Sequence, residues 1–252
     1  MTRIVTDLPD KTRIRFLRNK VTKWFEKNGR KYPWRGISDP FRILIAEMML
    51  QRTKADQVKP VYLHFFSIFK SVHEVANSSN EKLEGLLFPL GLKWRIKKFK
   101  EVSEVLKNNF RGKVPEDREN IMKLPGVGDY IAGIVLSTAF NKKEWIVDSN
   151  VVRVYRKYFG INTSKEGRRD RTIINISKEY ASCRNPCKAN LGLIDFASII
   201  CNPRKPLCSM CPLIKKPLED IIETARGCLS KFELKKSINN IYSKTNKKGD
   251  FP

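Results

Sequence analysis

A tight glycine turn, with a carboxylate downstream of it, is the feature of this chain best suited to chemistry. The turn reads L-P-G-V-G-D-Y over residues 124–130, and Asp148 follows at the end of an apolar stretch. Proline and glycine at this spacing predict a connection between two helices. Such a turn leaves backbone N–H groups available near Gly126 and Gly128, and these donors suit a phosphate. Asp148 is placed to act on the molecule that carries the phosphate.

The two glycines are expected to carry the shape of this turn. Glycine tolerates positive φ and close approach of another backbone, so a β-branched residue in place of Gly128 is predicted to disrupt the turn. The alternative for the turn alone is an ordinary helix connection, since proline and glycine punctuate turns of every kind.

The charge of the chain points to a polyanionic partner. Lys and Arg number 50 against 26 Asp and Glu, which gives a formal net charge of +24. Such an excess favours nucleic acid before membrane as the partner, although ribosomal proteins are equally basic. An apolar run of 18 residues and a secretory signal are both missing from the sequence. We therefore expect no membrane association and an intracellular, DNA-associated location in the cytoplasm or nucleoid.

The elements that must position these residues are predicted to be helices, so the fold class is all-α. With 252 residues, 41% of them hydrophobic, the chain can bury a core in one large or two small domains. Strand-like alternation is scarce, and residues 230–252 form a lysine- and asparagine-rich basic tail. Apolar residues recur at helical spacing over residues 41–69, 81–110, 130–140, 150–159 and 172–180.

A compact group of cysteines forms a second constellation. Cys201, Cys208 and Cys211 lie in the run C-N-P-R-K-P-L-C-S-M-C-P. Clustered cysteines without a secretory signal favour a metal site over disulfides. The alternative is a degenerate site whose thiols are reduced and partly buried.

The N-terminal third holds a carboxylate in unusual surroundings. Glu47 lies among Ala, Met and Leu, on a predicted helix for which Ser38 or Asp39 is the N-cap. Burial raises the pKa of a carboxyl group and lets it serve as an acid. The alternative for Glu47, and for Gln51 and Arg52 after it, is a solvated helix face.

These features together resemble the helix-hairpin-helix DNA glycosylases of the endonuclease III superfamily (HhH-GPD). The P-W-R run at residues 33–35 and the E-M-M-L-Q-R-T run at 47–53 resemble a segment shared by its two monofunctional branches. The resemblance extends over residues 14–213 and implies two helical lobes with DNA in the cleft between them. The implied divisions are an N-terminal helix of the second lobe (1–37), a barrel with the hairpin (38–155), a C-terminal lobe with the cysteine loop (156–229) and the tail (230–252).

The resemblance also implies a role for each candidate residue. The target base must be flipped out of the duplex, and positive charge then builds on its sugar as the base departs. Asp148 would stabilise that charge, and Glu47 would protonate the departing base. Gln51 and Arg52 would contact the orphaned base. The remaining DNA-binding candidates are Thr53, Leu124, Gly126, Val127, Gly128, Asn150 and Arg153.

Position 130 indicates which reaction follows. The bifunctional lyases of the superfamily place a lysine here, which forms a Schiff base with the sugar. Tyr130 cannot form that imine, so the resemblance implies a glycosylase without lyase activity. Tyr130 would instead pack against the flipped base or its sugar.

The cysteine spacing resembles the C-x6-C-x2-C-x5-C ligand set of a [4Fe–4S] cluster in this superfamily. The first three positions match, but the fourth is Pro217, which cannot ligate iron. Cys228, or else Cys183 or Cys187, would have to replace it. Otherwise the cluster has three protein ligands and is labile, or the cluster is absent.

The substrate is expected to be double-stranded DNA with a mismatched base, bound by a monomer. The G-L-K-W-R run at residues 91–95 and the cysteine-to-helix run at 187–196 favour the branch that removes thymine or uracil opposite guanine. The alternative is removal of adenine opposite guanine or 8-oxoguanine. A further alternative is a DNA-binding hairpin module without catalysis, which would have no use for Asp148, Glu47 or the cysteines.

Overall fold

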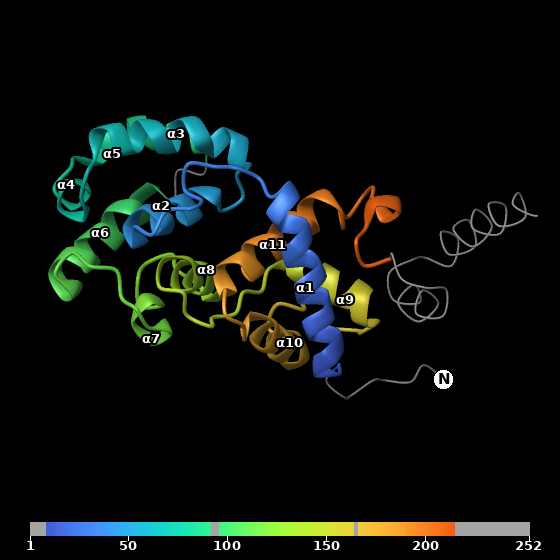
Figure 1. Cartoon of the computed structure of the whole chain (residues 1–252). Helices are drawn as coiled ribbons and strands as arrows, with labels where there is room; N and C mark the ends of the chain where they lie inside the picture. The colour runs from blue at the N-terminus through green and yellow to red at the C-terminus, as the bar shows by residue number, and fades with distance from the viewer. Residues whose placement is uncertain (1–8, 92–95, 164–165, 215–252) are drawn as a thin grey trace, which may run out of the picture. The chain divides into compact units, whose positions relative to one another are not determined.

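The computed structural model describes residues 9–91, 96–163 and 166–214, and within them the chain is helical with no strand, as the sequence predicted (Figure 1). No helix in these ranges is long and apolar enough to cross a membrane. The helices are α1 (Lys11–Asn28), α2 (Pro40–Leu50), α3 (Ala55–Ile68), α4 (Val72–Ala76), α5 (Asn80–Leu87), η1 (Phe88–Leu90), α6 (Ile96–Phe110), α7 (Arg118–Ile121), α8 (Asp129–Ala139), α9 (Ser149–Phe159), α10 (Arg171–Ala181), α11 (Pro186–Ile199) and η3 (Cys208–Met210).

The chain divides into two compact units. Among the described residues, the hairpin unit comprises those within 28–147 and 177–191, and the aspartate unit comprises those within 9–27, 148–176 and 192–214. The lobes implied by the sequence likewise group the N-terminal helix with C-terminal segments. Their boundaries at residues 37, 155 and 229 stay a prediction. The expected basic tail, Pro217 and Cys228 lie outside the described residues.

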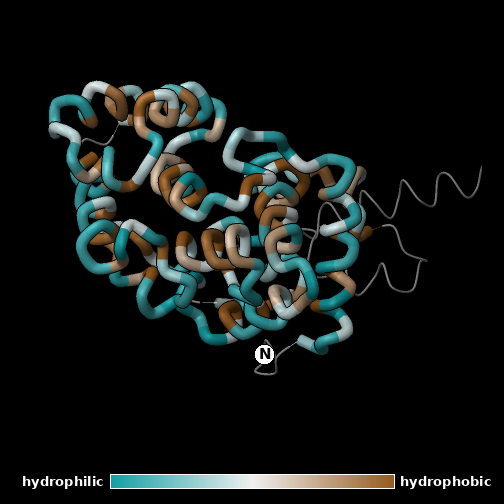
Figure 2. The backbone as a smooth tube through the Cα atoms, turned by 60° about the vertical axis from the view of Figure 1, so that its left-hand side comes forward, coloured by the Kyte–Doolittle hydropathy of each residue, from teal (hydrophilic) through white to brown (hydrophobic). Residues whose placement is uncertain are grey.

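The core of the hairpin unit is built on α2 and α8. These two helices pack against each other, α3 covers α2, and α4 and α5 pack on α6 (Figure 1). α2 is buried from Ile43 to Met49, and α8 from Ile131 to Ser137. Helices that are apolar on every side belong in a core. Other helices carry apolar residues on one face and polar residues on the other, seen as brown and teal along the tube (Figure 2).

Two of the stretches with apolar residues at helical spacing contain a break. The 41–69 pattern breaks between α2 and α3, where Arg52 takes a left-handed φ of 58°. The 81–110 pattern breaks after η1, and residues 92–95 lie outside the described residues. Apolar periodicity continues through both breaks, so the spacing alone did not reveal them. Of the two predicted N-caps of α2, Ser38 and Asp39, the cap is Asp39. Its carboxylate accepts a hydrogen bond from the Arg42 N–H at 3.0 Å.

The aspartate unit packs α1 and α9 with the C-terminal part of α11. Ile14, Leu17 and Val21 of α1 are buried, and Trp24 meets the ring of Phe196 edge-on at 5.9 Å. α9 buries one face and carries its charged residues on the other. It begins at its cap, Asp148, and ends at Gly160, which is left-handed.

Candidate active site and nucleic-acid interface

The turn between α7 and α8 has the geometry of a helix hairpin. The Val127 N–H donates to the Leu124 carbonyl at 3.1 Å, and Gly126 between them has a φ of 83°. A positive φ at this place with proline before it is typical of a type II turn. The side chains of Leu124 and Val127 are buried, so any contact of these two residues with DNA would come from their backbone.

The start of α8 has backbone N–H groups of the kind that bind an anion. The first N–H groups of a helix have no partner within it, and its dipole places partial positive charge there. The cap of α8 is Gly128, which brings no side chain to these donors. A phosphate is the group that such a helix start accepts.

The expected conformational reason for Gly128 is wrong. Its φ is −110°, which any residue adopts, and a Cβ added there meets nothing within 4 Å. The conformational need for glycine lies at Gly126 instead. A β-branched residue in place of Gly128 would therefore cause no backbone strain in the turn.

The residues after α2 lie against this turn. The Gln51 side-chain amide donates to the Gly126 carbonyl at 3.1 Å. Thr53 donates through its hydroxyl to the carbonyls of Gln51 and Leu90, and Arg52 is exposed. Two segments 75 residues apart, both predicted to contact DNA, are thus joined at one edge of the hairpin unit.

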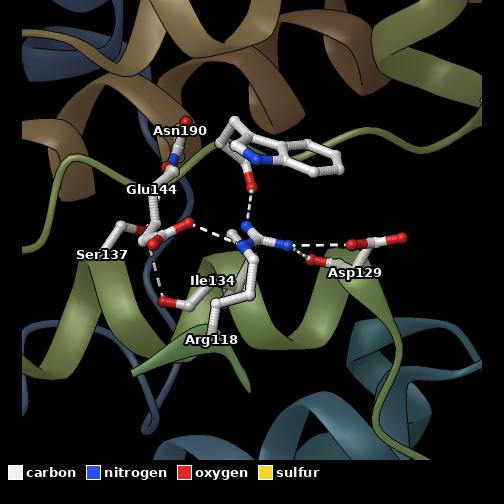
Figure 3. A network of polar contacts seen from close by, with 7 residues as sticks. Arg118, Asp129, Ile134, Ser137, Glu144 and Asn190 are labelled. Atoms are coloured by element: carbon white, nitrogen blue, oxygen red, sulfur yellow. Dashed lines mark hydrogen bonds and ion pairs between the residues drawn. The ribbon is translucent and has the colours of Figure 1, made fainter. Parts of the chain in front are cut away.

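Arg118 ties three segments of the hairpin unit together (Figure 3). Its guanidinium bonds Asp129 at the start of α8 (3.0 Å to the carboxylate), Glu144 (2.8 Å) and the Trp145 carbonyl (2.9 Å). The Trp145 ring lies 4.2 Å from the guanidinium carbon, which adds a cation–π contact. The two hairpin helices and the segment after α8 are therefore fixed by one side chain.

The segment from Glu144 to Val147 is tightly held. Asn190 of α11 bonds the Glu144 carbonyl at 2.9 Å and the Ser137 hydroxyl at 3.0 Å, and Ser177 donates to the Ile146 carbonyl at 2.6 Å. Gly133 of α8 allows the close approach, since a Cβ there would lie 2.0 Å from the Trp145 carbonyl. These contacts fix the stretch that leads directly into Asp148.

Asp148 is a half-buried N-cap. One carboxylate oxygen accepts from the Val151 N–H at 2.7 Å, and the other accepts from the Asn150 amide at 2.8 Å. The carboxylate is therefore oriented by its own helix. A fixed carboxylate of this kind is suited to stabilise positive charge on a sugar.

Arg153 supports this arrangement from within the aspartate unit. Its guanidinium donates to Asn150 at 3.0 Å and to the carbonyls of Ala197 and Cys201, both at 2.9 Å. Three of the five guanidinium N–H groups are thereby committed to the protein. The predicted DNA contact of Arg153 stays a prediction, and its evident role is to fix Asn150.

Glu47 and Tyr130 belong to the hairpin unit, whereas Asp148, Asn150 and Arg153 belong to the aspartate unit. Glu47 is only 7% exposed, so the alternative of a solvated helix face is wrong for this residue. Tyr130 is half-buried, at the second position of α8.

The three clustered cysteines line one apolar hollow with Phe196 and Ile200. Burial and the neighbouring thiols of Cys201 and Cys208 raise the pKa of Cys211 to about 11. In the part of the chain that the structure describes, no three Cys, His, Asp or Glu side chains form a group able to hold a metal ion. The described residues thus do not by themselves fit a cluster, and Cys183 and Cys187 belong to the hairpin unit.

Arg118 is the residue that sequence reasoning missed. Its partners lie 11 to 27 residues further along the chain, so no local pattern marks it. Only the folded hairpin unit brings them together.

Comparison with known proteins agrees with this geometry. The chain is 37% identical over 202 residues to a thymine/uracil-DNA glycosylase of Pyrobaculum aerophilum, covering 78% of this chain and 87% of the relative. It is 31% identical over 240 residues to an adenine DNA glycosylase of Buchnera aphidicola, covering 90% of this chain and 69% of that relative.

A solved thermostable thymine-DNA glycosylase has a similar fold. Its TM-score is 0.75 at 34% identity, over 79% of this chain and 93% of that one. Residues 45–179 match the HhH-GPD superfamily of base excision DNA repair proteins, a range that includes the hairpin, Glu47 and Asp148. The chain belongs to the HhH-GPD superfamily of base excision DNA repair proteins.

Proposed function

We propose that this protein is a monofunctional DNA glycosylase that removes thymine or uracil opposite guanine from duplex DNA. The observation that carries the proposal is Asp148, a carboxylate fixed by Val151 and Asn150 at the start of α9. The names of the relatives from Pyrobaculum aerophilum and Methanothermobacter thermautotrophicus, both thymine/uracil-DNA glycosylases, support the choice of base.

In the proposed reaction the hairpin holds the DNA backbone. Phosphate accepts hydrogen bonds from the start of α8, while Gln51 and Arg52 face the base left without a partner. Because Gln51 is bonded to the Gly126 carbonyl, its side chain is already placed beside the turn. Thr53 and Asn150 support these contacts through their bonds to neighbouring groups.

The flipped nucleotide then loses its base. The bond between the sugar C1′ and the base nitrogen breaks, and its electron pair leaves with the base. Asp148 stabilises the positive charge that develops on the sugar. Glu47 supplies a proton to the departing base. Water then adds at C1′ and gives up one proton to the Asp148 carboxylate, which leaves an abasic site. Tyr130 lies where a lyase would need an amine, so the strand is not cut.

The cysteines carry no step of this reaction. Cys201, Cys208 and Cys211 line one hollow, but these three thiols do not by themselves form a metal-binding group. A fourth ligand is needed to complete the [4Fe–4S] set, and Pro217 and Cys228 lie outside the described residues. The cluster therefore stays a prediction, as do the monomeric state and the intracellular location.

The experiment that tests the function is base release from a panel of duplexes. Duplexes with T:G, U:G, A:G and A:8-oxoguanine are incubated with the protein, and the abasic strand is cut with alkali. Release of thymine or uracil opposite guanine supports the proposal, and a matched duplex serves as the control. Release of adenine alone supports the second candidate, an adenine glycosylase, which the Buchnera aphidicola relative favours. Binding without any release supports a non-catalytic module.

A further inference from the structure

A basic groove runs along α9 in the aspartate unit, and we call it the α9 groove. It is an open hollow of about 1060 Å³, lined by one face of α9 from Ser149 to Lys157. Gly160, Ile161, Asn162, Glu166 and Arg168 complete the lining. Its charged residues are Arg153, Arg156, Lys157, Glu166 and Arg168. Among the described residues, the lining thus holds four cations and a single carboxylate.

Some charged side chains of the groove already form hydrogen bonds or ion pairs within the protein, and others do not. Glu166 is paired with Arg168, and Arg153 donates to backbone carbonyls and Asn150. Arg156 is exposed and Lys157 half-exposed, and neither forms an ion pair with a described residue. Arg156 and Lys157 are therefore the cations available to an outside anion.

The length of the groove suits a polymer of phosphates. The helix rises about 1.5 Å per residue, so the stretch from Ser149 to Gly160 spans roughly 16 Å. One strand of duplex DNA carries a phosphate about every 3.4 Å of its axis, so this length corresponds to roughly five phosphates. A small anion would fill only part of such a groove.

The position of the groove links it to the reaction. Its first lining residue, Ser149, follows Asp148 directly, and both belong to the aspartate unit. Arg153 connects the two, since it lines the groove and also bonds the Asn150 that orients Asp148. DNA held in the groove would therefore lie along the helix that carries the catalytic candidate.

We propose that the α9 groove binds the DNA backbone through Arg156 and Lys157, as a second phosphate site separate from the hairpin. This inference rests on the proposed function only in taking DNA as the substrate. Contacts to phosphate carry no sequence information, so the groove contributes affinity for matched and mismatched duplexes alike.

Another role for these two cations must be separated from this one. Arg156 and Lys157 lie in the last turn of α9, where positive charge stabilises the helix dipole. If that were their only task, reversing them would lower the thermal stability and leave the salt dependence of DNA binding unchanged.

The test compares two double variants with the same change in net charge. Arg156→Glu with Lys157→Glu alters the groove. Lys59→Glu with Lys82→Glu alters exposed lysines on α3 and α5, which carry no predicted DNA contact. Affinity for a matched duplex is measured between about 50 and 200 mM salt, a range over which phosphate contacts change affinity strongly.

We expect the groove variant to bind at least about tenfold more weakly, with the slope of log affinity against log salt reduced by about 2. The control should stay within about threefold of the wild type, with its slope unchanged. Equal losses in both variants, or no loss in the groove variant, would overturn the proposal. If the groove variant fails to fold, Arg156→Gln with Lys157→Gln is measured instead and should show the same reduction in slope.

The outcome is distinguishable from failure of the proposed function. If the wild type releases no base but the groove variant shows the reduced slope, the groove proposal stands and the glycosylase proposal fails. If the wild type releases thymine or uracil but the groove variant binds normally, the glycosylase proposal stands and the groove proposal fails.

Discussion

The side chain of Asn150 forms hydrogen bonds with both Asp148 and Arg153. The Asn150 amide donates to the Asp148 carboxylate at 2.8 Å, and its oxygen accepts from Arg153 at 3.0 Å. Because Arg153 also bonds two carbonyls after and within α11, the orientation of Asp148 depends on the chain nearly 50 residues downstream. The candidate catalytic carboxylate is thus positioned by tertiary contacts as well as by its own helix.

The first prediction concerns Asp148→Asn. Asparagine is also a good N-cap, so the start of α9 should survive while the negative charge is lost. We expect base release to fall by about 10²-fold or more, with DNA affinity within a few-fold of the wild type. Single-turnover release and a binding titration measure the two effects. Release faster than about a tenth of the wild-type rate would remove Asp148 from the central role.

A second prediction separates the two glycines of the hairpin. Gly126→Ala forces alanine to a φ of 83°, so we expect binding to every duplex to weaken about fivefold, equivalent to ~1 kcal/mol of strain. Gly128→Ala is the matched control, since its φ of −110° and the open space around it accept a Cβ. Affinities for matched and mismatched duplexes measure both variants. Equal weakening by the two changes would show that space at the phosphate, and not backbone strain, requires glycine.

A third prediction concerns Arg118→Met, which keeps much of the side-chain volume but removes the charge and the donors. Glu144 is only 25% exposed and would be left without this cation. We expect unfolding to become easier by about 2 kcal/mol, because a charged hydrogen-bond network of limited exposure is broken. For a chain of this size that lowers Tm by roughly 4–8 °C.

The control for Arg118 is its most exposed ion pair. Asp129 is 56% exposed, so Asp129→Asn should lower Tm by much less. Thermal unfolding followed by circular dichroism gives both values. A larger effect of Asp129→Asn than of Arg118→Met would contradict the network described for the hairpin unit.

A fourth prediction follows from Tyr130. On a duplex with T:G the protein should leave an abasic strand that stays intact until alkali or heat is applied. Borohydride should trap no covalent adduct, because a phenol forms no imine. Strand cleavage without treatment, together with a trapped adduct, would mean that a lysine elsewhere forms the imine. Tyr130→Phe should remain free of lyase activity and serves as the control.

A fifth prediction concerns iron. If the cluster forms, anaerobically purified protein should contain about three to four irons per chain and absorb visible light. Cys208→Ser should then lose iron and thermal stability, because metal binding contributes folding free energy. Iron loss in Cys183→Ser would identify Cys183 as a ligand. Iron loss in Cys228→Ser would identify the fourth ligand. Iron-free wild type and a silent Cys208→Ser would show that the cluster prediction is wrong.

Local features were predictable from the sequence. The cap of α2 follows from Asp39, because a cap bonds an N–H three residues away and so depends only on neighbours in the chain. Asp148 caps α9 in the same way, although only a catalytic role was predicted for it from the sequence. The hairpin turn follows for the same reason from its proline and from Gly126. The motifs also indicated the family, since their chemistry depends on residue type and short spacing.

Tertiary structure decided the rest. The burial of Glu47, the bond from Gln51 to Gly126 and the ties made by Arg118 and Arg153 join segments that lie tens of residues apart or depend on helix packing. Apolar spacing over residues 41–69 predicted helix but not the break at Arg52, because apolar periodicity continues past this residue and does not report the φ of a single backbone position. Sequence thus specified which groups are present, whereas folding alone set which of them meet, since a hydrogen bond between distant residues requires the chain to bring them together.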